Sequence, residues 1–454
     1  MSIRLLSTVL LASFTVSSAV ASPGPTPTEP ATASEPTIPT VPSVPTEPAP
    51  APALAPASAP APKKSSWRGF RLASDDDAYR LRIAGVLQVD TTTFPGDDAK
   101  VYLDEVRLRR ARLQIRATTA RYFDYRILLD FADARVQILD AVFETTFLEE
   151  LRFRIGKEKS PVSVDRAQSA TALHFLERSP SQGLATNRDL GIQLAGKIDK
   201  GLIDYQLGLW DGTPDGASVE QNPEDDFDFA GRVTFQPFIN AGLPALKNLQ
   251  LGVSGSFGST TGIQAATQLA TYRTSGRATW FRYASGSDLP TTAIADGDRV
   301  RLGGHLLWTF GPVHLFGEVI QSSQEVTLAD RTETITNLGY GVQTSWVLTG
   351  EDASWSGLTP ARTFDPSAGA WGALELAVRW GETLIDDLAF DAGFADENRS
   401  ARRASAFSAS LNWYLDAAVK LQLNVELTSF ENGAAAGADR DAETLIGARG
   451  QFLF

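Results

Sequence analysis

The stretch VKLQLNVEL, residues 419–427, alternates strictly between apolar and polar side chains. Leucine and valine occupy the odd positions, and Lys420, Gln422, Asn424 and Glu426 occupy the even ones. Successive side chains of a β-strand point to opposite faces, so one face of this segment is apolar and the other is charged. Such alternation over about ten residues is typical of a strand in a transmembrane β-barrel, which meets lipid outside and water inside.

The same alternation recurs on both sides of this stretch. A soluble β-sandwich would also alternate, but its opposite face would not carry so many Arg, Asp, Glu and Lys side chains. Bacterial barrels of one chain have even strand numbers, so a seventeenth extended segment, 270–283, is assigned to a long loop that folds into the lumen. The fold class predicted is all-β, a 16-stranded antiparallel transmembrane β-barrel with inward-folded loops. Its strands are expected near residues 78–92, 105–118, 121–131, 135–147, 150–156, 188–199, 202–211, 226–236, 249–258, 298–310, 312–325, 334–348, 370–382, 402–416, 418–430 and 443–454.

The two ends of the chain indicate export and assembly. Residues 1–21 read as a signal peptide, with Arg4, an apolar region and the small residues Ala19 to Ala21. Residues 22–66 are rich in Pro and Ala, which predicts an extended periplasmic linker or, alternatively, a tether to the cell wall. Residues 67–454 would form the barrel. The aromatic C-terminus, Phe454, resembles the assembly signal of outer-membrane barrels and implies the barrel-assembly machinery as a partner.

Tight connections such as Gly311-Pro312 alternate with long ones along the barrel. Short turns are expected on the periplasmic side, and long loops outside. The acidic loops 212–225 and 383–400 would then face outside, where divalent cations could bridge them to lipopolysaccharide in the outer-membrane lipid.

Composition excludes several classes of site. The chain has no cysteine, and its three histidines do not stand at a metal-ligand spacing, so neither a metal centre nor a cofactor is expected. The net charge is −13, which favours no nucleic-acid partner. The charge is uneven: residues 65–200 carry 22 basic and 20 acidic groups, and residues 201–454 carry 16 basic and 31 acidic groups. The first half of the barrel therefore keeps a basic excess.

Residues 155–191 interrupt the alternation with about 30 residues that carry Lys157, Lys159, Arg166, Arg178 and Arg188. Loops of this length inside a compact domain are usually functional. We interpret this segment as the constriction loop of a pore, with its cations lining the passage.

A second group of cations lies on one predicted strand. Arg110, Arg112, Gln114 and Arg116 share one face, about 7 Å apart, which suits guanidinium groups that pass a phosphate or carboxylate from one to the next. The alternative is that lumen arginines only pair with lumen carboxylates such as Asp130 and Asp140. For the arginines of segment 270–283, cation–π contacts with Tyr272, Trp280 and Phe281 are the alternative.

From Tyr79 to Phe454 the chain resembles the phosphate-selective porin family, porins O and P. The resemblance implies a trimeric 16-stranded channel in the outer membrane, with an arginine ladder and inward-folded third and fifth loops. The stretches that carry it are LRIAGVLQVD (81–90), VRLRRARLQI (106–115), LDAVFE (139–144), RIGKEKSPVSVD (154–165), FLERS (175–179), YQLGLWDGTPDG (205–216), GEVIQSSQEV (317–326), SWVLTGED (345–352), LNWYLD (411–416) and RGQFLF (449–454).

Carried over by position, the resemblance also implies anion-binding residues. Arg110 and Arg112 match a pair on the second strand, and Arg166 and Arg178 match basic positions of the third loop. Two further positions, Arg273 and Arg277, lie where the fifth loop carries lysines. Asp140 matches a carboxylate that accepts a hydrogen bond from protonated phosphate.

These observations lead to one predicted function and one alternative. The predicted function is passive diffusion of small anions, phosphate or polyphosphate first, through an arginine-lined constriction in an outer-membrane porin of a Gram-negative cell. The alternative is a general, weakly selective porin, which the net charge favours. A barrel enzyme would need a nucleophile beside a histidine and an acid, and no such motif is present.

Overall fold

The computed structural model describes residues 69–97, 102–218 and 226–454, so the predicted signal peptide and linker lie outside the described residues. The strands are β1 (Phe70–Ala73), β2 (Arg80–Thr93), β3 (Glu105–Thr119), β4 (Phe123–Asp130), β5 (Gln137–Thr145), β6 (Arg152–Lys159), β7 (Arg188–Ile198), β8 (Ile203–Trp210), β9 (Asp228–Phe235), β10 (Gln250–Thr261), β11 (Thr271–Arg273), β12 (Thr279–Arg282), β13 (Ile294–Phe310), β14 (Val313–Leu328), β15 (Arg331–Val347), β16 (Ala373–Leu384), β17 (Ala401–Tyr414), β18 (Val419–Asn432) and β19 (Glu443–Leu453). The two short α-helices are α1 (Val164–Ala167) and α2 (Leu388–Asp391).

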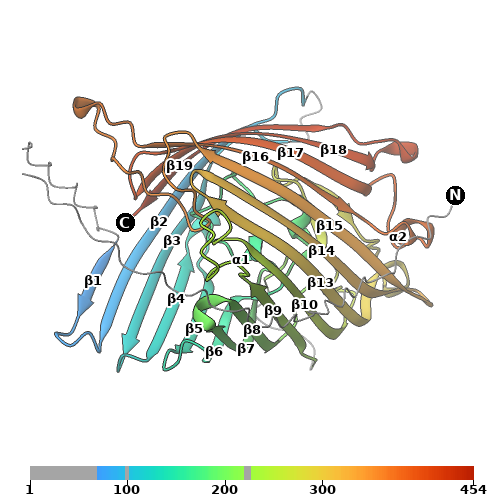
Figure 1. Ribbon diagram of the computed structural model, residues 1–454. Helices are drawn as coiled ribbons and strands as arrows, with labels where there is room; N and C mark the ends of the chain where they lie inside the picture. The colour runs from blue at the N-terminus through green and yellow to red at the C-terminus, as the bar shows by residue number, and fades with distance from the viewer. Residues whose placement is uncertain (1–68, 98–101, 219–225) are drawn as a thin grey trace, which may run out of the picture. The chain divides into compact units, whose positions relative to one another are not determined.

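Sixteen of these strands form one closed antiparallel barrel. Strands β2 to β10 pair in chain order, and so do β13 to β19. Strand β10 pairs with β13, and β19 pairs with β2 to close the sheet (Figure 1). The short strand β1 lies beside the start of β2, with Phe70 opposite Ile83. The predicted fold class and all sixteen predicted strands are confirmed, and closure leaves none of the sixteen barrel strands at a sheet edge.

The barrel is polar inside and apolar outside, as the sequence pattern predicts. On β18, Leu423 is 60% exposed on the outer face, whereas Lys420 and Glu426 are each 2% exposed on the lumen face. Exposed apolar side chains alternate with buried polar ones along the other strands too. In water this distribution would be unfavourable, so the outer face is a lipid-facing surface. No helix in the described part of the chain has the length and apolarity to cross a bilayer.

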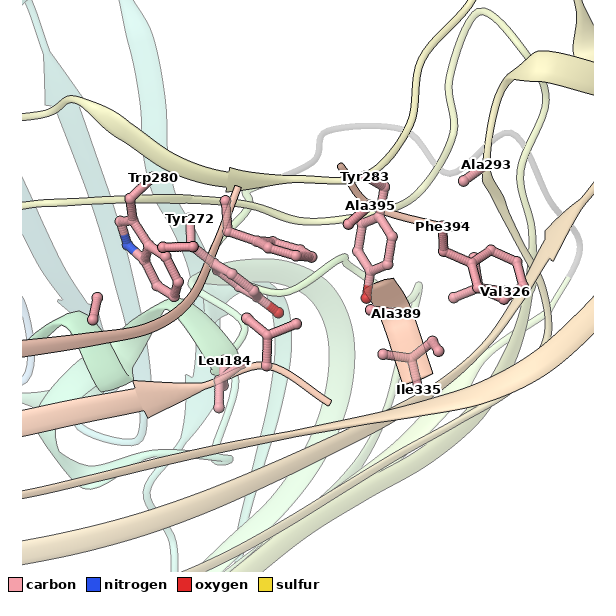
Figure 2. Packing of buried hydrophobic residues seen from close by; sticks show 14 of the residues in the cluster. Leu184, Tyr272, Trp280, Tyr283, Ala293, Val326, Ile335, Ala389, Phe394 and Ala395 are labelled. Carbon is pink, nitrogen blue, oxygen red and sulfur yellow. The ribbon is translucent and has the colours of Figure 1, made fainter. Parts of the chain in front are cut away.

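Segment 270–283 is a loop inside the barrel, as predicted. Its strands β11 and β12 form a separate hairpin, whose Tyr272, Trp280 and Phe281 are almost fully buried. These rings pack with Leu184 of the third loop and with Ile335 on the lumen face of β15 (Figure 2). An apolar core therefore fills part of the lumen beside β14 and β15.

One prediction about the connections is wrong. The connection between β15 and β16, residues 348–372, is long but lies at the end of the barrel that holds the C-terminus, where short turns were expected. Its Ala353 and Leu358 pack against Tyr414, and its Trp355 ring stacks on His314 at 5.4 Å between ring centroids. This loop is long because it carries apolar side chains that pack into the lumen.

The acidic loop 383–400 and residues 212–218 of the other acidic loop, 212–225, follow strands that run away from the C-terminal end, so they lie at the opposite end of the barrel, together with the third loop. Residues 219–225 are outside the described residues. That this end faces the cell exterior stays a prediction.

The outer face of β18 gives the first testable prediction. Replacing Leu423 by arginine should lower the free energy of unfolding in lipid by roughly 2–4 kcal/mol, because a charge would face the hydrocarbon. The matched control is Leu243→Arg, since Leu243 is exposed in the connection between β9 and β10. Urea titration of protein folded into lipid vesicles measures both variants, and equal stabilities would contradict a lipid-facing outer surface.

Candidate functional site: a basic cavity beneath the third loop

The third loop, residues 160–187, crosses the lumen between β6 and β7. It contains α1, a tip at residues 170–174 and a 3-10 turn, Pro180–Leu184, on its return. At the tip, wall side chains donate hydrogen bonds to main-chain carbonyl oxygens of the loop. Gln88 reaches Ala170 (3.3 Å), Lys420 and Gln422 reach Leu173 (2.9 and 3.2 Å), Gln451 reaches Thr171 (3.1 Å) and Asn412 reaches His174 (3.0 Å).

These wall donors come from strands β2, β17, β18 and β19. A loop without regular structure leaves peptide groups unpaired, and burying them without partners is costly. The polar lumen face of these strands satisfies those groups, which fixes the loop across the pore.

A cavity of about 290 Å³ lies between the third loop and strands β3 to β7. We call it the basic cavity. Eight basic and three acidic side chains line it, an excess of five positive charges. They are Arg109, Arg110, Arg112, Lys157, Lys159, Arg166, Arg178 and Arg188, with Asp130, Asp133 and Glu177.

All four wall arginines of the basic cavity have carboxylate partners, and Arg110 lies 3.6 Å from Glu177. The Arg112 guanidinium donates to Asp130 at 2.8 Å, and that of Arg188 donates to Asp140 at the same distance. Arg109 holds Glu177 through two hydrogen bonds of 2.5 and 3.1 Å. Arg112 and Arg188 therefore pair with the lumen carboxylates Asp130 and Asp140, as the alternative interpretation of the lumen arginines expected. Both arginines still line the basic cavity.

Arg166 and Arg178 of the loop, and Lys159 at the end of β6, are held mainly by main-chain carbonyls, although Arg178 also lies 3.6 Å from the Asp165 carboxylate. Arg166 donates to the carbonyl oxygen of Gln182 (3.1 and 2.5 Å), and Arg178 donates to those of Asp165 and Gln168 (3.0 and 2.7 Å). Lys159 donates to the Gln168 carbonyl at 2.7 Å. Among the described residues, no carboxylate lies within ion-pair distance of Lys159 or Arg166. The Arg166 guanidinium is thus oriented by the loop without a carboxylate that would neutralise its charge.

The charge of Arg166 persists at neutral pH. Burial, followed by the charge of Arg178, lowers the pKa of Arg166 to about 10, which still leaves it protonated. Burial raises the pKa of the Glu177 carboxyl, but the charges of Arg109 and Arg110 outweigh burial and hold this pKa well below its usual value. Glu177 thus stays ionised and anchors the loop to β3.

The structure brings four of the seven predicted site residues together and separates three. Arg110, Arg112, Arg166 and Arg178 line the basic cavity. The pair Arg273 and Arg277 lines a neighbouring cavity of about 300 Å³, which shares Arg109 and Glu177 with the basic cavity. Asp140 lies behind Arg188 and Arg126, which contact it at 2.8 and 3.5 Å, and does not line the basic cavity. Its role as a hydrogen-bond acceptor for phosphate stays a prediction.

Strict alternation missed Arg109. The pairing of β2 with β3 shifts between Gln88, which faces Arg110, and Val89, which faces Leu108. This β-bulge leaves Arg109 as an extra residue and turns it towards the lumen, where it contacts Glu177. The sequence around Arg109 contains no glycine or other residue that would indicate a bulge.

The cationic lining continues from the cavity towards the C-terminal end. Arg82, Arg116 and Arg126 lie side by side on β2, β3 and β4, because Arg116 faces both of the others in register. Like charges in directly facing positions destabilise a sheet. Of these three, Arg126 has carboxylate partners, Glu158 at 3.0 Å and Asp140 at 3.5 Å, while no described carboxylate lies within ion-pair distance of Arg82 or Arg116. This row extends the positive surface below the third loop.

Comparison with known proteins places this chain in a family. Residues 81–454 match the family described as phosphate-selective porin O and P. The chain belongs to this family. It is also 23% identical over 419 residues to porin O of Pseudomonas aeruginosa, an alignment that covers 85% of this chain and 91% of that protein. The resemblance inferred from the sequence is confirmed, and the chain is an outer-membrane porin.

Solved structures share the fold at low sequence identity. The outer membrane channel DcaP of Acinetobacter baumannii matches with a TM-score of 0.54 and 11% identity, over 86% of this chain and all of that one. An anion-selective porin from Comamonas acidovorans matches with a TM-score of 0.52 and 11% identity, over 83% of this chain and all of that one. Both likenesses concern the barrel architecture alone.

The Glu177 anchor gives a prediction with a defined pH dependence. Glu177→Gln should lower the free energy of unfolding by about 1.5–3 kcal/mol at neutral pH, because hydrogen bonds to a charged group are lost. Since the folded-state pKa is depressed, this difference should be full above the usual glutamate value of 4.5 and shrink only as pH falls below it.

Denaturant unfolding of both proteins across pH measures this difference. The control is Glu149→Gln, because Glu149 is exposed in the turn between β5 and β6. A difference that already disappears above pH 4.5 would contradict a Glu177 carboxylate stabilised by arginines.

Proposed function

We propose that this porin conducts small anions passively, with phosphate as the preferred solute. The observation that carries the proposal is the excess of five positive charges around the basic cavity, in which Lys159 and Arg166 have no carboxylate within ion-pair distance in the described part of the chain. The family description and the name of the Comamonas porin support the same class of solute.

The arrangement suits conduction because the attraction of the anion is divided among several cationic sites along the passage. An anion would first meet Arg273 and Arg277 in the neighbouring cavity, then the basic cavity, and then the row at Arg116. Guanidinium groups present paired N–H donors that match phosphate oxygens. Conduction needs attraction strong enough to replace some hydration, spread over several sites so that the ion can leave.

The overall charge of −13 does not oppose this proposal. Many of the acidic groups lie in end loops, where Asp387 and Asp391, for example, are within 2.8 and 3.5 Å of Arg402. The Debye length is about 8 Å at physiological salt, so distant carboxylates are largely screened from an ion inside the constriction. Arginines that touch the ion are not screened in this way, and the low-dielectric wall strengthens their field.

The fold and the family favour a channel over an enzyme. Within the described residues, no group of three or more histidine, aspartate or glutamate side chains could hold a metal ion. We further propose a homotrimer, on the family resemblance, and a proline-rich periplasmic linker over residues 22–66. The Phe454 carboxy-terminal residue would be read by the barrel-assembly machinery.

Phosphate should block chloride current through the wild-type channel, because both anions compete for the basic cavity. Arg166→Ala, Arg178→Ala and Arg112→Ala should each raise the half-blocking phosphate concentration by about tenfold, the effect of losing roughly 1.4 kcal/mol of binding free energy. Single-channel recording in planar bilayers measures the block.

The control for these variants is Arg403→Ala, since Arg403 pairs with Glu431 outside both cavities. Anion selectivity without any phosphate block would instead support the general, weakly selective porin. A block unchanged in all three cavity variants would contradict the assignment of the site.

A further inference from the structure

A single buried carboxylate joins the two limbs of the third loop to the barrel wall. Glu318 projects from the lumen face of β14 and is 8% exposed. Its Oε1 accepts a hydrogen bond of 2.7 Å from the Val164 N–H on the outgoing limb. Its Oε2 accepts one of 2.7 Å from the Gln182 side chain on the returning limb, and Ser163 Oγ lies 2.7 Å from the same oxygen.

The same two limbs hold a cation of the basic cavity. Ser163 Oγ accepts a hydrogen bond from the Arg166 main-chain N–H at 3.1 Å, and the Gln182 carbonyl oxygen accepts two from the Arg166 guanidinium. Both partners are buried, with Ser163 at 0% and Gln182 at 3% exposure. A continuous chain of contacts therefore runs from Glu318 to Arg166.

Stability alone does not explain a carboxylate at this position. Its neighbours on the lumen face of β14, Phe316 and Ile320, are apolar and buried. Removing a carboxylate from water is costly, and an apolar side chain in the same volume is often neutral or more stable. The carboxylate instead fixes the positions of both limbs, because three donors from the two limbs converge on it.

We propose that Glu318 is a positioning residue that holds the third loop against β14 and thereby sets the width of the passage and the place of Arg166. The expected effect of Glu318 on anion passage rests on the proposed function. Its effect on the loop itself does not depend on which anion passes.

The test exchanges the two groups of one hydrogen bond. In Glu318→Gln, the new N–H₂ group faces the N–H₂ group of Gln182 and the bond between them is lost; a flip of the Gln182 amide would restore it only by breaking the bond that its oxygen accepts from Ser163 Oγ. In Gln182→Glu, two carboxylates face each other. In the double variant, a carboxylate at 182 again accepts from an amide at 318, while the amide oxygen at 318 still accepts from Val164. The control is Glu382→Gln, because Glu382 is a buried carboxylate on the outward-facing side of β16, and its partners Tyr340 and Ser405 belong to the barrel wall and not to the third loop.

The readouts are single-channel chloride conductance, open-channel current noise and the half-blocking phosphate concentration, on the full-length protein in planar bilayers. Each single variant should increase the conductance and the noise. Each should also weaken the block by about threefold to tenfold, the range expected for one lost hydrogen bond. The double variant should return to within about twofold of wild type, since the bond is restored.

Several outcomes overturn the inference. The first is that the single variants match wild type in conductance, noise and block. The second is that the double variant is no closer to wild type than the single ones. The third is that Glu382→Gln has effects as large as those of Glu318→Gln. If a single variant does not assemble, recovery of assembly in the double variant supports the coupling, and failure of both overturns it. A wild-type channel that phosphate does not block would count against the proposed function alone, because the conductance and noise tests use chloride only.

Discussion

The hydrogen bonds between the lumen wall and the carbonyl oxygens of the third loop are the interactions on which the site depends. A loop of 28 residues with little regular structure cannot pair its own peptide groups, so it must find donors elsewhere. Gln88, Lys420 and Asn412 supply them at the tip, from strands far apart in the sequence. The polar inner faces of the strands are therefore a docking surface for the loop as well as a lining for water. Without this docking, Arg166 and Arg178 would have no fixed position relative to Arg112.

The distribution of charge follows from the same arrangement. Cations buried together repel each other and lose hydration, so each needs a partner. On the wall, carboxylates such as Asp130 and Asp140 supply the partner, and the charge is balanced. On the loop, carbonyl oxygens supply it, which orients a guanidinium without cancelling its charge. The local excess of positive charge is thus a product of how the loop is held, and it exists in a chain whose net charge is negative.

The barrel could be predicted from the sequence because each strand alternates between a charged lumen face and an apolar lipid face. This alternation determines which way each side chain points, as at Lys420 and Leu423. The sequence also identified the third loop and seven of the eight cations that meet in one cavity. It did not place Arg109, which depends on a bulge, or the inward course of residues 348–372, which depends on packing against Tyr414. Nor did the spacing of the three histidines show that His174 and His314 would lie with ring centroids 4.9 Å apart. All these features depend on contacts between distant segments, which no local pattern encodes.

The central claim is that charges touching the ion, and not the net charge of the chain, decide selectivity. The zero-current potential of the wild-type channel across a potassium chloride gradient tests this claim most directly. The structure predicts a potential of the sign that chloride permeation produces, and a shift towards zero as salt rises, because screening strengthens with ionic strength. A potential of the opposite sign, produced by potassium permeation, would show that the acidic loops dominate and would contradict the account.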